Sequence, residues 1–411
     1  MIRFILADLR RFRGGALAVI VLIALSVALS VTVTLQERAV RLGSARAAEK
    51  FDLVIGAAGS ETQLALSAVF LQPAPLPLMS SAVLAKLATD PRAAFAAPVG
   101  FGDSADGYPV VGTTAALVSA LSPALAEGAL FARLGEAVVG ADVAKPLGAE
   151  IKPMHGAADE GGHTHTEIAY RVSGRMAPTG TAWDRAILVP IRAVWQLHGM
   201  EGGHEDEHEH DHDHGHEAHV DADAALGEHF DAATPGIPAI LVKPKTVADA
   251  YRLRQKYRGE TTLAIFPAEV LTRLYATLGD ARSLLLAIAA GTQVIVVAAI
   301  LLVTVMHVGA RRRQIGALRA FGAPRRSVLA IVWGELVLLF LAGFALGVLA
   351  GFCAAQAISA SLAAMTAVRM PVEFAREDMA LAVWFLLLAA LVSVVPALLA
   401  LRLSPAGALK A

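Results

Sequence analysis

The chain has 411 residues, of which 56% are hydrophobic and 17% are charged, and its mean hydropathy is +0.57. A soluble protein of this length needs more charged residues to cover its surface, so the composition excludes an ordinary soluble protein and indicates a membrane protein. The 35 basic and 36 acidic residues nearly cancel, so the net charge gives no reason to expect nucleic acid as a partner. The single cysteine, Cys353, excludes a disulfide or a thiolate metal cluster within one chain.

Four long apolar segments predict four transmembrane helices. A hydrocarbon core about 30 Å thick requires about 20 helical residues, and each segment is long enough. In chain order we place the helices at residues 14–36, 283–308, 327–355 and 379–401. The first resembles an export signal because arginines precede it, but its apolar stretch is too long and no small-residue cleavage site follows. We therefore interpret it as an uncleaved membrane anchor.

The basic residues near the helix ends predict the orientation of the chain. Four arginines precede the first helix, six lie between the second and the third, and Arg402 and Lys410 follow the fourth. Because cytoplasmic loops carry the excess of Lys and Arg, we expect both termini in the cytoplasm. The cytoplasmic segments are then 1–13, 309–326 and 402–411, and the external ones are 37–280 and the short loop 356–378.

Residues 37–280 alternate short apolar runs with turns rich in Gly and Pro, which predicts an α+β domain. Four runs are expected to form strands: Ala137–Gly140, Ile168–Val172, Ala186–Pro190 and Ala239–Val242. Two segments are expected to form helices: Thr246–Tyr257 and Ala268–Leu278. The second of these is expected to run toward the second membrane helix.

Three glycines at four-residue spacing, Gly343, Gly347 and Gly351, form a small-residue row on the third membrane helix. Such a row allows two helix backbones to approach closely. The row fits packing against a neighbouring helix of the same chain and equally a seam between two copies. The sequence leaves both interpretations open.

Residues 201–231 form a strongly biased segment with eight histidines, twelve acidic residues and no Lys or Arg. The rest of the chain holds 24 acidic and 35 basic residues, so the near-neutral total conceals a basic protein with one acidic loop. Imidazole and carboxylate groups together bind Zn²⁺, Ni²⁺ or Cu²⁺. The candidate metal ligands are His204, His208, His210, His212, His214, His216 and His219.

Several interpretations of this segment stay open. Glycines at positions 202, 203 and 215 argue against a fixed geometry, so we expect exchanging sites of low specificity. A solvated, disordered insertion that binds metal only in vitro fits the same composition, and so does a pH sensor. A smaller cluster, His155, His163 and His165, lies about forty residues earlier.

Residues 309–326 are predicted to form a short cytoplasmic helix with an apolar ridge and basic flanks. Ile315, Leu318 and Phe321 recur at three-residue spacing, and Gly322 follows as a stop. Such a helix suits docking into a groove of a cytoplasmic partner, and equally an interfacial position on anionic lipid head groups. The candidate docking residues are Arg311, Arg312, Arg313, Ile315, Leu318, Arg319 and Phe321.

The sequence shows no sign of an enzyme. No lysine directly follows a glycine, so the phosphate-binding loop of ATPases is absent. No stretch resembles a nucleophile elbow or a metalloprotease helix. If ATP drives this protein, a separate subunit must hydrolyse it.

Several stretches resemble FtsX-like/MacB-type ABC transporter permeases. Their coupling segment is similar to Arg311–Glu335, RRRQIGALRAFGAPRRSVLAIVWGE, and their C-terminal signature is similar to Leu401–Lys410, LRLSPAGALK. A MacB-like periplasmic domain is similar to FDLVIGAAGSETQLALSAVF (Phe51–Phe70), EAVVGADVAKPLG (Glu136–Gly148) and PTGTAWDRAILVPIRAVWQLHG (Pro178–Gly199). The position of the His-rich loop after the last of these stretches is typical of one branch.

The resemblance implies a fold and a set of partners. The fold would be an α-helical membrane protein with four transmembrane helices, one plus three, and an α+β MacB-like periplasmic domain between the first and the second. The chain would form a homodimer, or a pseudo-symmetric pair with another permease chain, among the lipids of the bacterial inner membrane. This pair would bind two copies of a separate ATP-binding subunit through Arg311–Phe321. ATP-driven closure would pass through this coupling helix and the membrane helices to residues 37–280.

Three functions compete. The first is a permease subunit with MacB/FtsX-like mechanotransmission in the handling of zinc or another divalent metal, with a periplasmic metal-binding protein as a further partner. The second keeps the architecture but moves lipoprotein, lipid, peptide or drug, and the histidines are incidental. The third is an ATP-independent, metal-binding membrane receptor or scaffold. In all three, the expected cofactors are limited to Zn²⁺, Ni²⁺ or Cu²⁺ at the loop.

Overall fold

The computed structural model describes residues 13–155, 163–164, 168–200, 220–231, 234–276 and 324–394, and the single residues 10, 287, 290, 291, 294 and 298. The chain divides into two compact units. The helical unit consists of Met1–Val40, Leu278–Ala360 and Pro371–Ala411. The sheet unit consists of Arg41–Thr277 and Ser361–Met370. The sheet unit therefore combines most of the predicted external domain with part of the predicted loop 356–378.

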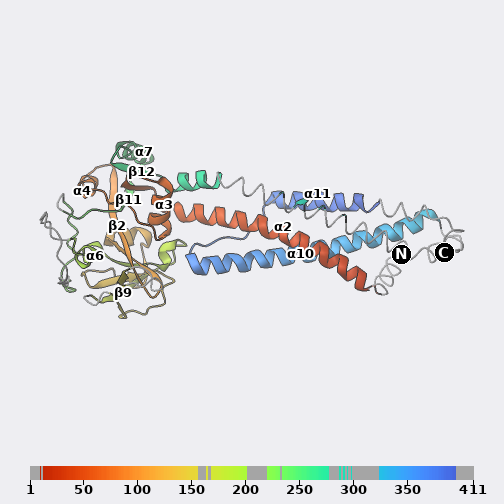
Figure 1. Cartoon of the computed structure of the whole chain (residues 1–411), viewed down its shortest axis with the longest axis horizontal. Helices are drawn as coiled ribbons and strands as arrows, with labels where there is room; N and C mark the ends of the chain where they lie inside the picture. Colours follow the sequence, from red (N-terminus) through yellow and green to blue (C-terminus); the bar gives the residue numbers. More distant parts are fainter. Residues whose placement is uncertain are drawn as a thin grey trace, which may run out of the picture. The chain divides into compact units, whose positions relative to one another are not determined.

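Long apolar helices form the helical unit (Figure 1): α2 spans Arg13–Ala48, α10 spans Arg325–Thr366 and α11 spans Arg376–Val392. Among the described residues, two helices are long and apolar enough to cross a membrane, α2 and the Leu329–Thr366 part of α10. The predicted span 283–308 lies outside the described residues apart from isolated positions, as does span 379–401 beyond residue 394. Two of the four predicted spans are therefore confirmed.

The structure differs from the sequence prediction within the segment 356–378, because α10 continues as a helix to Thr366. Residues 353–364 are rich in alanine, which favours the helix most strongly, and contain neither Gly nor Pro. The helix ends where Ala367 adopts a left-handed backbone conformation, with φ of 57°. In the same way α2 continues beyond the predicted span end at residue 36 and stops only at Ala48.

The described residues of the sheet unit contain a twelve-stranded sheet. The main path has the order β12-β1-β11-β2-β3-β10-β5-β9-β4, and the short strands β6, β7 and β8 pair outside it. The strands are β1 (Leu53–Ala57), β2 (Ala93–Ala105), β3 (Tyr108–Thr113), β4 (Leu125–Gly128), β5 (Glu136–Val139), β6 (Glu150–Ile151), β7 (Met154–His155), β8 (His163–Thr164), β9 (Tyr170–Met176), β10 (Ile187–Pro190), β11 (Ala239–Pro244) and β12 (Thr262–Ile265).

Short helices accompany the sheet. They are α3 (Glu61–Phe70), α4 (Ala82–Ala88), α5 (Ala115–Leu121), α6 (Ile191–Leu197), α7 (Val247–Lys256) and the 3-10 helix η2 (Ala182–Arg185), and residues 267–276 are also helical. Ser60 starts α3 and Thr246 starts α7, because each hydroxyl accepts a hydrogen bond from a backbone N–H in the first turn. The starts of these two helices are therefore set by local sequence.

The predicted α+β character of this unit is confirmed. The four predicted strands correspond to β5, β9, β10 and β11, and the predicted helix Thr246–Tyr257 corresponds to α7. The predicted helix Ala268–Leu278 is helical as far as the described residues extend, to residue 276. The first strands of the chain, β1 to β3, and helices α3 to α6 were not predicted individually.

The core lies on both faces of the sheet, as the alternation along β1 shows. Leu53 and Ile55 pack in one buried cluster with Leu84 of α4, whereas Val54 packs in another with Leu64 of α3. Because successive side chains of a strand point to opposite faces, each face of the strand has its own helical cover. Strand β2 pairs with β11 over its first part and with β3 over its second, so it joins the two halves of the sheet.

Candidate functional site

The predicted glycine row of α10 lies against α2. A Cβ atom added to Gly343 would lie 2.7 Å from the Cβ of Ile23, and one added to Gly347 would lie 2.6 Å from the Cβ of Val27. At Gly351 the added atom would lie 2.7 Å from a backbone carbonyl oxygen of α2. Side chains do not tolerate such distances, so only glycine lets the two backbones approach this closely. The structure thus places the row at a contact within one chain.

Polar side chains connect the same two helices. The Thr32 hydroxyl lies 3.2 Å from the carbonyl oxygen of Gly351 and 2.7 Å from that of Ala28, one turn earlier in its own helix. The Ser359 hydroxyl donates to Oε1 of Gln36 at 3.3 Å. Hydrogen bonds between helices in a membrane contribute about 0.6–2 kcal/mol each. The contact of α2 with α10 is therefore both close and polar at several positions.

An ion pair joins α2 to the start of α11. The Arg38 guanidinium donates to both carboxylate oxygens of Asp378, with Nη2 2.9 Å from Oδ1, and Nη1 also donates to the Glu373 carbonyl at 3.2 Å. Both side chains of the pair are only 15% exposed. Asp378 also accepts from the backbone N–H of Ala375, directly before α11, at 2.7 Å. One carboxylate therefore both caps α11 and orients it against α2.

In the sheet unit, the last turns of α2 pack against the segment that follows α10. A Cβ atom added to Gly43 would lie 2.7 Å from the carbonyl oxygen of Arg369. Ala47 forms a small buried cluster with Ala182 of η2 and Val368. Small residues thus allow three segments that are remote in sequence to pack closely together. We call this contact the junction.

Two residues beside the junction adopt a left-handed backbone conformation although neither is glycine. Leu71 ends α3 with φ of 53°, and Ala367 ends α10 with φ of 57°. Such a conformation costs a side-chain-bearing residue about 1–2 kcal/mol. Leu71 also packs against the Ala47 cluster. Backbone strain persists only where the surrounding structure holds it, so the junction is a strongly determined part of the fold.

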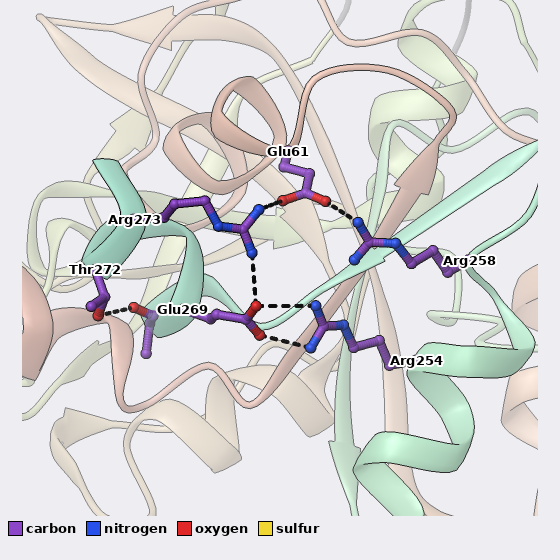
Figure 2. A network of polar contacts seen from close by, with 7 residues as sticks. Glu61, Arg254, Arg258, Glu269, Thr272 and Arg273 are labelled. Carbon is purple, nitrogen blue, oxygen red and sulfur yellow. Dashed lines mark hydrogen bonds and ion pairs between the residues drawn. The ribbon is translucent and has the colours of Figure 1, made fainter. Parts of the chain in front are cut away.

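Figure 2 shows an ion-pair network that fixes residues 267–276 to neighbouring elements. Arg273 donates to Glu61 of α3 at 3.0 Å and to Glu269 at 2.7 Å. Glu269 also accepts from Arg254 of α7 at 2.7 and 3.3 Å, and Glu61 accepts from Arg258 at 2.5 Å. The bonds from Arg254 hold the pKa of the Glu269 carboxyl below its usual value. These ion pairs therefore tie together α3, the end of α7 with the turn that follows it, and residues 267–276.

A hydrogen bond connects the helical segment 267–276 to α2 within the sheet unit. The Tyr275 hydroxyl donates to the Ser44 hydroxyl at 2.7 Å. Val270 and Leu271, on the same segment, are buried in the main hydrophobic core. Along the chain this segment leads to the predicted span 283–308. The end of α2, beyond the first predicted span, and the helical segment before the second predicted span are therefore anchored to one another.

The predicted docking and metal residues lie outside the described part of the chain. The docking residues fall in segment 311–323, and the metal candidates fall in segment 201–219. Among the side chains that the structure describes, no three His, Cys, Asp or Glu groups gather where they could hold a metal ion. Both assignments stay predictions.

Sequence reasoning missed the ion pairs. Arg38 lies two residues beyond the charge-free stretch 14–36, and Asp378 directly precedes the predicted span 379–401. The available signal for this pair was that two apolar segments each have a charged residue at one end, and that the two charges are opposite. The network in Figure 2 offered no such signal, because Glu61 and Arg273 are 212 positions apart.

Comparison with known proteins bears on the C-terminal part of the chain. Residues 286–405 match the family described as FtsX-like permease C-terminal. Among solved structures, the periplasmic region of MacB from Actinobacillus actinomycetemcomitans is similar at 12% sequence identity and a TM-score of 0.32, over 55% of this chain and 95% of that chain. No curated protein matches the chain. The resemblance to FtsX-like permeases is thus confirmed over residues 286–405, and the chain is a membrane protein.

Proposed function

We propose that this chain is the permease subunit of an ABC transporter that is driven by a separate ATPase and transmits motion to an external domain. FtsX-like permeases pair with an ABC ATPase subunit, and residues 286–405 match that family. The observation that carries the proposal is the continuity of α2, one unbroken helix from Arg13 to Ala48 whose last turns pack into the junction. A continuous helix of this kind transmits a displacement of one end to the other end.

The length of α2 supports this transmission. At a rise of 1.5 Å per residue its 36 residues span about 54 Å, whereas the hydrocarbon core is about 30 Å thick. A substantial part of the helix therefore extends beyond the bilayer without a break. The glycine row and the Thr32 hydroxyl hold α10 against α2. The two helices would accordingly move as a pair.

In this proposal the protein lies in the bacterial inner membrane with both termini in the cytoplasm and the sheet unit in the periplasm. Two copies of the chain pair with two copies of the ATPase, which they contact through residues 309–326. Closure of the ATPase on ATP displaces this coupling helix, and the membrane helices carry the displacement outward. The sheet unit then engages or releases its cargo.

A docking variant tests the proposal directly. Arg312→Glu combined with Leu318→Ala reverses one charge and shortens the apolar ridge of the predicted coupling helix. We expect loss of co-purification with the ATPase and loss of ATPase stimulation in proteoliposomes, whereas Lys410→Glu, a charge reversal in the tail, retains both. Unchanged association and stimulation in the docking variant would overturn the proposal and favour an ATP-independent receptor or scaffold.

We also propose that residues 201–231 bind Zn²⁺ or a related ion and give the transporter a role in metal handling. The support is the composition of the segment, with eight histidines among twelve acidic residues. The test replaces the seven candidate histidines with glutamine, keeping length and acidity, and compares growth under zinc limitation and zinc excess. Altered growth under either condition supports the role. Unchanged growth with intact ATP-coupled activity contradicts it.

An apolar cavity in the helical unit supports a second candidate cargo, a lipid, lipoprotein or other apolar molecule. The cavity has a volume of about 580 Å³, which is in the range of small-molecule pockets. Its walls come from α2, α10 and α11 and include Val27, Val31, Phe344, Val348, Met379 and Phe385. Native mass spectrometry should detect a bound lipid that is lost in Val31→Trp and kept in Leu17→Trp, which changes an exposed position of α2.

A further inference from the structure

A small cavity lies between α5 and the sheet. It has a volume of about 240 Å³, and its walls come from the segment that follows α2, from β2, from α5 and from β11. All of its lining residues belong to the sheet unit. Eight of the eleven are apolar, and the three others, Lys50, Asp52 and Lys243, are charged. The cavity therefore combines an apolar interior with a few charged groups, as ligand sites do.

The apolar residues form the inner wall of the cavity. Phe51, Leu117 and Leu241 are buried members of the main hydrophobic core, and Phe95 packs against the same core. Such a wall offers no hydrogen-bond partner to water, and dry apolar cavities in proteins bind small apolar molecules. Since a cavity of about 150 Å³ accepts benzene, this cavity has room for about nine or ten non-hydrogen atoms.

The charged lining residues lie at the solvent side of the cavity. Lys50 is exposed, and the side chains of Lys243 and Asp52 are 52% and 34% exposed. The Lys243 ammonium lies 2.6 Å from Oδ2 of Asp52, whereas Lys50 forms no ion pair with any residue that the structure describes. Two cations thus accompany one carboxylate, which leaves a surplus of one positive charge. This surplus attracts an anion to the solvent side of the cavity.

We propose that this cavity binds an anionic amphiphile with a short apolar tail, of which a medium-chain carboxylate is the simplest example. The tail packs against Phe51, Phe95 and Leu241, and the carboxylate meets Lys50 and Lys243. Octanoate, with about ten non-hydrogen atoms, has the size that the cavity admits. Burial of the tail supplies the affinity, and the two ammonium groups select the charge of the ligand.

The cavity lies close to the end of α2. Phe51 follows Ala48, the last residue of that helix, and both belong to one buried cluster. The Phe51 ring lies 5.8 Å, centroid to centroid, from the ring of Trp183, and the preceding residue, Ala182, is part of the junction. A tail in contact with Phe51 is therefore two side chains away from the junction. An effect of the ligand on ATP-driven motion rests on the proposed function, whereas the binding itself does not.

A packing gap between α5 and the sheet is the competing explanation. Such a gap admits small apolar molecules by size alone and is indifferent to their charge. A site for an anionic amphiphile distinguishes octanoate from octanol, which has the same chain and no charge, and it depends on Lys50. The two explanations therefore differ in the effect of charge on the ligand and on the protein, and this difference decides the experiment.

The test uses the full-length chain in lipid nanodiscs, without the ATPase, and an octanoate that carries a photoreactive diazirine in its tail. Irradiation links the tail to adjacent residues, and mass spectrometry locates the product. We expect labelling within residues 51–53 or 117–121, suppressed by excess octanoate. Ala120→Trp fills the cavity from an exposed lining position of α5 and should reduce labelling about tenfold or more. The control Ala116→Trp changes an exposed position of α5 that does not line the cavity and should be labelled as the parent is.

A second variant tests the choice of an anion without filling the cavity. Lys50→Gln should weaken labelling by the octanoate probe several-fold, whereas Lys245→Gln, at an exposed lysine outside the cavity, should leave it unchanged. A diazirine-bearing octanol should label the parent several-fold more weakly than the octanoate probe does. Circular dichroism shows whether each variant folds.

Two results would overturn the site. The first is labelling of folded Ala120→Trp equal to that of the parent, and the second is equal labelling of the parent by the octanoate and octanol probes. Failure of the transporter proposal is a separate outcome, read from the docking variant of the predicted coupling helix. If the cavity is labelled but the docking variant retains ATPase stimulation, the site stands and the proposed function fails. If the docking variant loses stimulation but the cavity is not labelled, the proposed function stands and the site fails.

Discussion

Ala367 ends α10 in a left-handed conformation that glycine adopts without a side-chain penalty. Because its φ is 57°, we expect Ala367→Gly to raise the free energy of unfolding by about 0.5–1 kcal/mol. Thermal unfolding of the purified chain in detergent measures the change. The matched control is Ala360→Gly, at an exposed position inside the same helix, which should lower stability by a similar amount. Equal effects of the two substitutions would contradict the strain at the helix end.

Asp90 predicts a dependence of stability on pH. Its side chain, only 4% exposed, accepts hydrogen bonds from Arg92 at 2.6 and 2.8 Å and from Lys256 at 3.1 Å. The bonds from Arg92 lower the pKa of this carboxyl. A lowered pKa in the folded state means that the stabilisation is complete above the unfolded pKa of about 3.9 and is lost as the pH falls toward the folded value.

Asp90→Asn should therefore destabilise the chain by about 1–3 kcal/mol at pH 7, because it removes charge-assisted hydrogen bonds. The difference from the parent should shrink below about pH 4, where the stabilisation from the parent carboxylate begins to be lost. Denaturant unfolding at about pH 7 and at about pH 3 measures it. A difference that stays constant between these two values would show that the carboxylate charge is not the cause.

Single residues could be foreseen from sequence only where their chemistry shows locally. The glycine row was predicted because four-residue spacing is visible in the chain, and Thr246 was predicted as the start of a helix. The strained Ala367 was not, since alanine normally continues a helix and its left-handed φ depends on the packing around it. Partners of charged residues were likewise hidden, because ion pairs join positions that are distant in sequence.

At the scale of the elements, the contact of α2 with α10 depends on the absence of side chains. Gly347→Ala adds a Cβ that would lie 2.6 Å from the Cβ of Val27, so the helices must separate. We expect a loss of about 1–3 kcal/mol in stability, the usual cost of overpacking. Gly14→Ala, on α2 with no atom within 4 Å of an added Cβ, should instead be neutral or stabilising by up to about 1 kcal/mol. Thermal unfolding of both variants measures this.

The contact of α2 with α11 depends on one ion pair. Asp378→Asn removes the charge that binds Arg38 and should lower stability by about 1–2 kcal/mol, whereas Glu377→Gln, at the exposed neighbouring position, should have little effect. The exchange of charges, Arg38→Asp with Asp378→Arg, should recover part of the loss. Unfolding free energies of the two single variants and the double variant give the interaction energy. Additive effects would contradict a direct pair.

The elements themselves were predictable to different degrees. Long apolar stretches indicated α2 and α10, and β-branched runs indicated β5, β10 and β11. Strand β2 was missed because AAFAAPVG is rich in alanine and contains a proline, which are poor indicators of a strand. The short strands β7 and β8 were missed because each has two residues, too few for any periodicity. Pairing with neighbours, and not the strand sequence, creates them.

At the scale of the whole molecule, the network in Figure 2 should contribute to the proposed transmission of motion from the ATPase to the sheet unit. Arg273→Ala removes the bonds to Glu61 and Glu269 and so weakens the attachment of residues 267–276 to the sheet unit. We expect ATP-dependent transport to fall several-fold while association with the ATPase persists. The control is Arg252→Ala, a more exposed arginine of α7 that lies 3.7 Å from Asp249 of its own helix. Equal transport in both variants would show that this network does not contribute to the transmission of motion to the sheet unit.

The order of helical and sheet-forming segments along the chain could be predicted, but the division of the chain into its two compact units could not. The charge-free stretches and the turn-rich region 37–280 indicated an apolar helix, an α+β domain and further apolar segments. The inclusion of Ser361–Met370 in the sheet unit could not be predicted, since it depends on the contacts of Gly43 and Ala182 with residues 368–369. Contacts of this kind follow from packing in three dimensions and leave no periodic trace.

The unbroken course of α2 restricts how its length can change. Each residue turns the helix by about 100°, so one inserted residue between Gln36 and Val40 would rotate Gly43 and Ala47 away from their partners relative to Ile23 and Val27. An insertion of about seven residues, two full turns, would restore the facing. An inserted length that preserves this angular phase should therefore leave both sets of contacts of α2 intact, whereas a single inserted residue should weaken one of them.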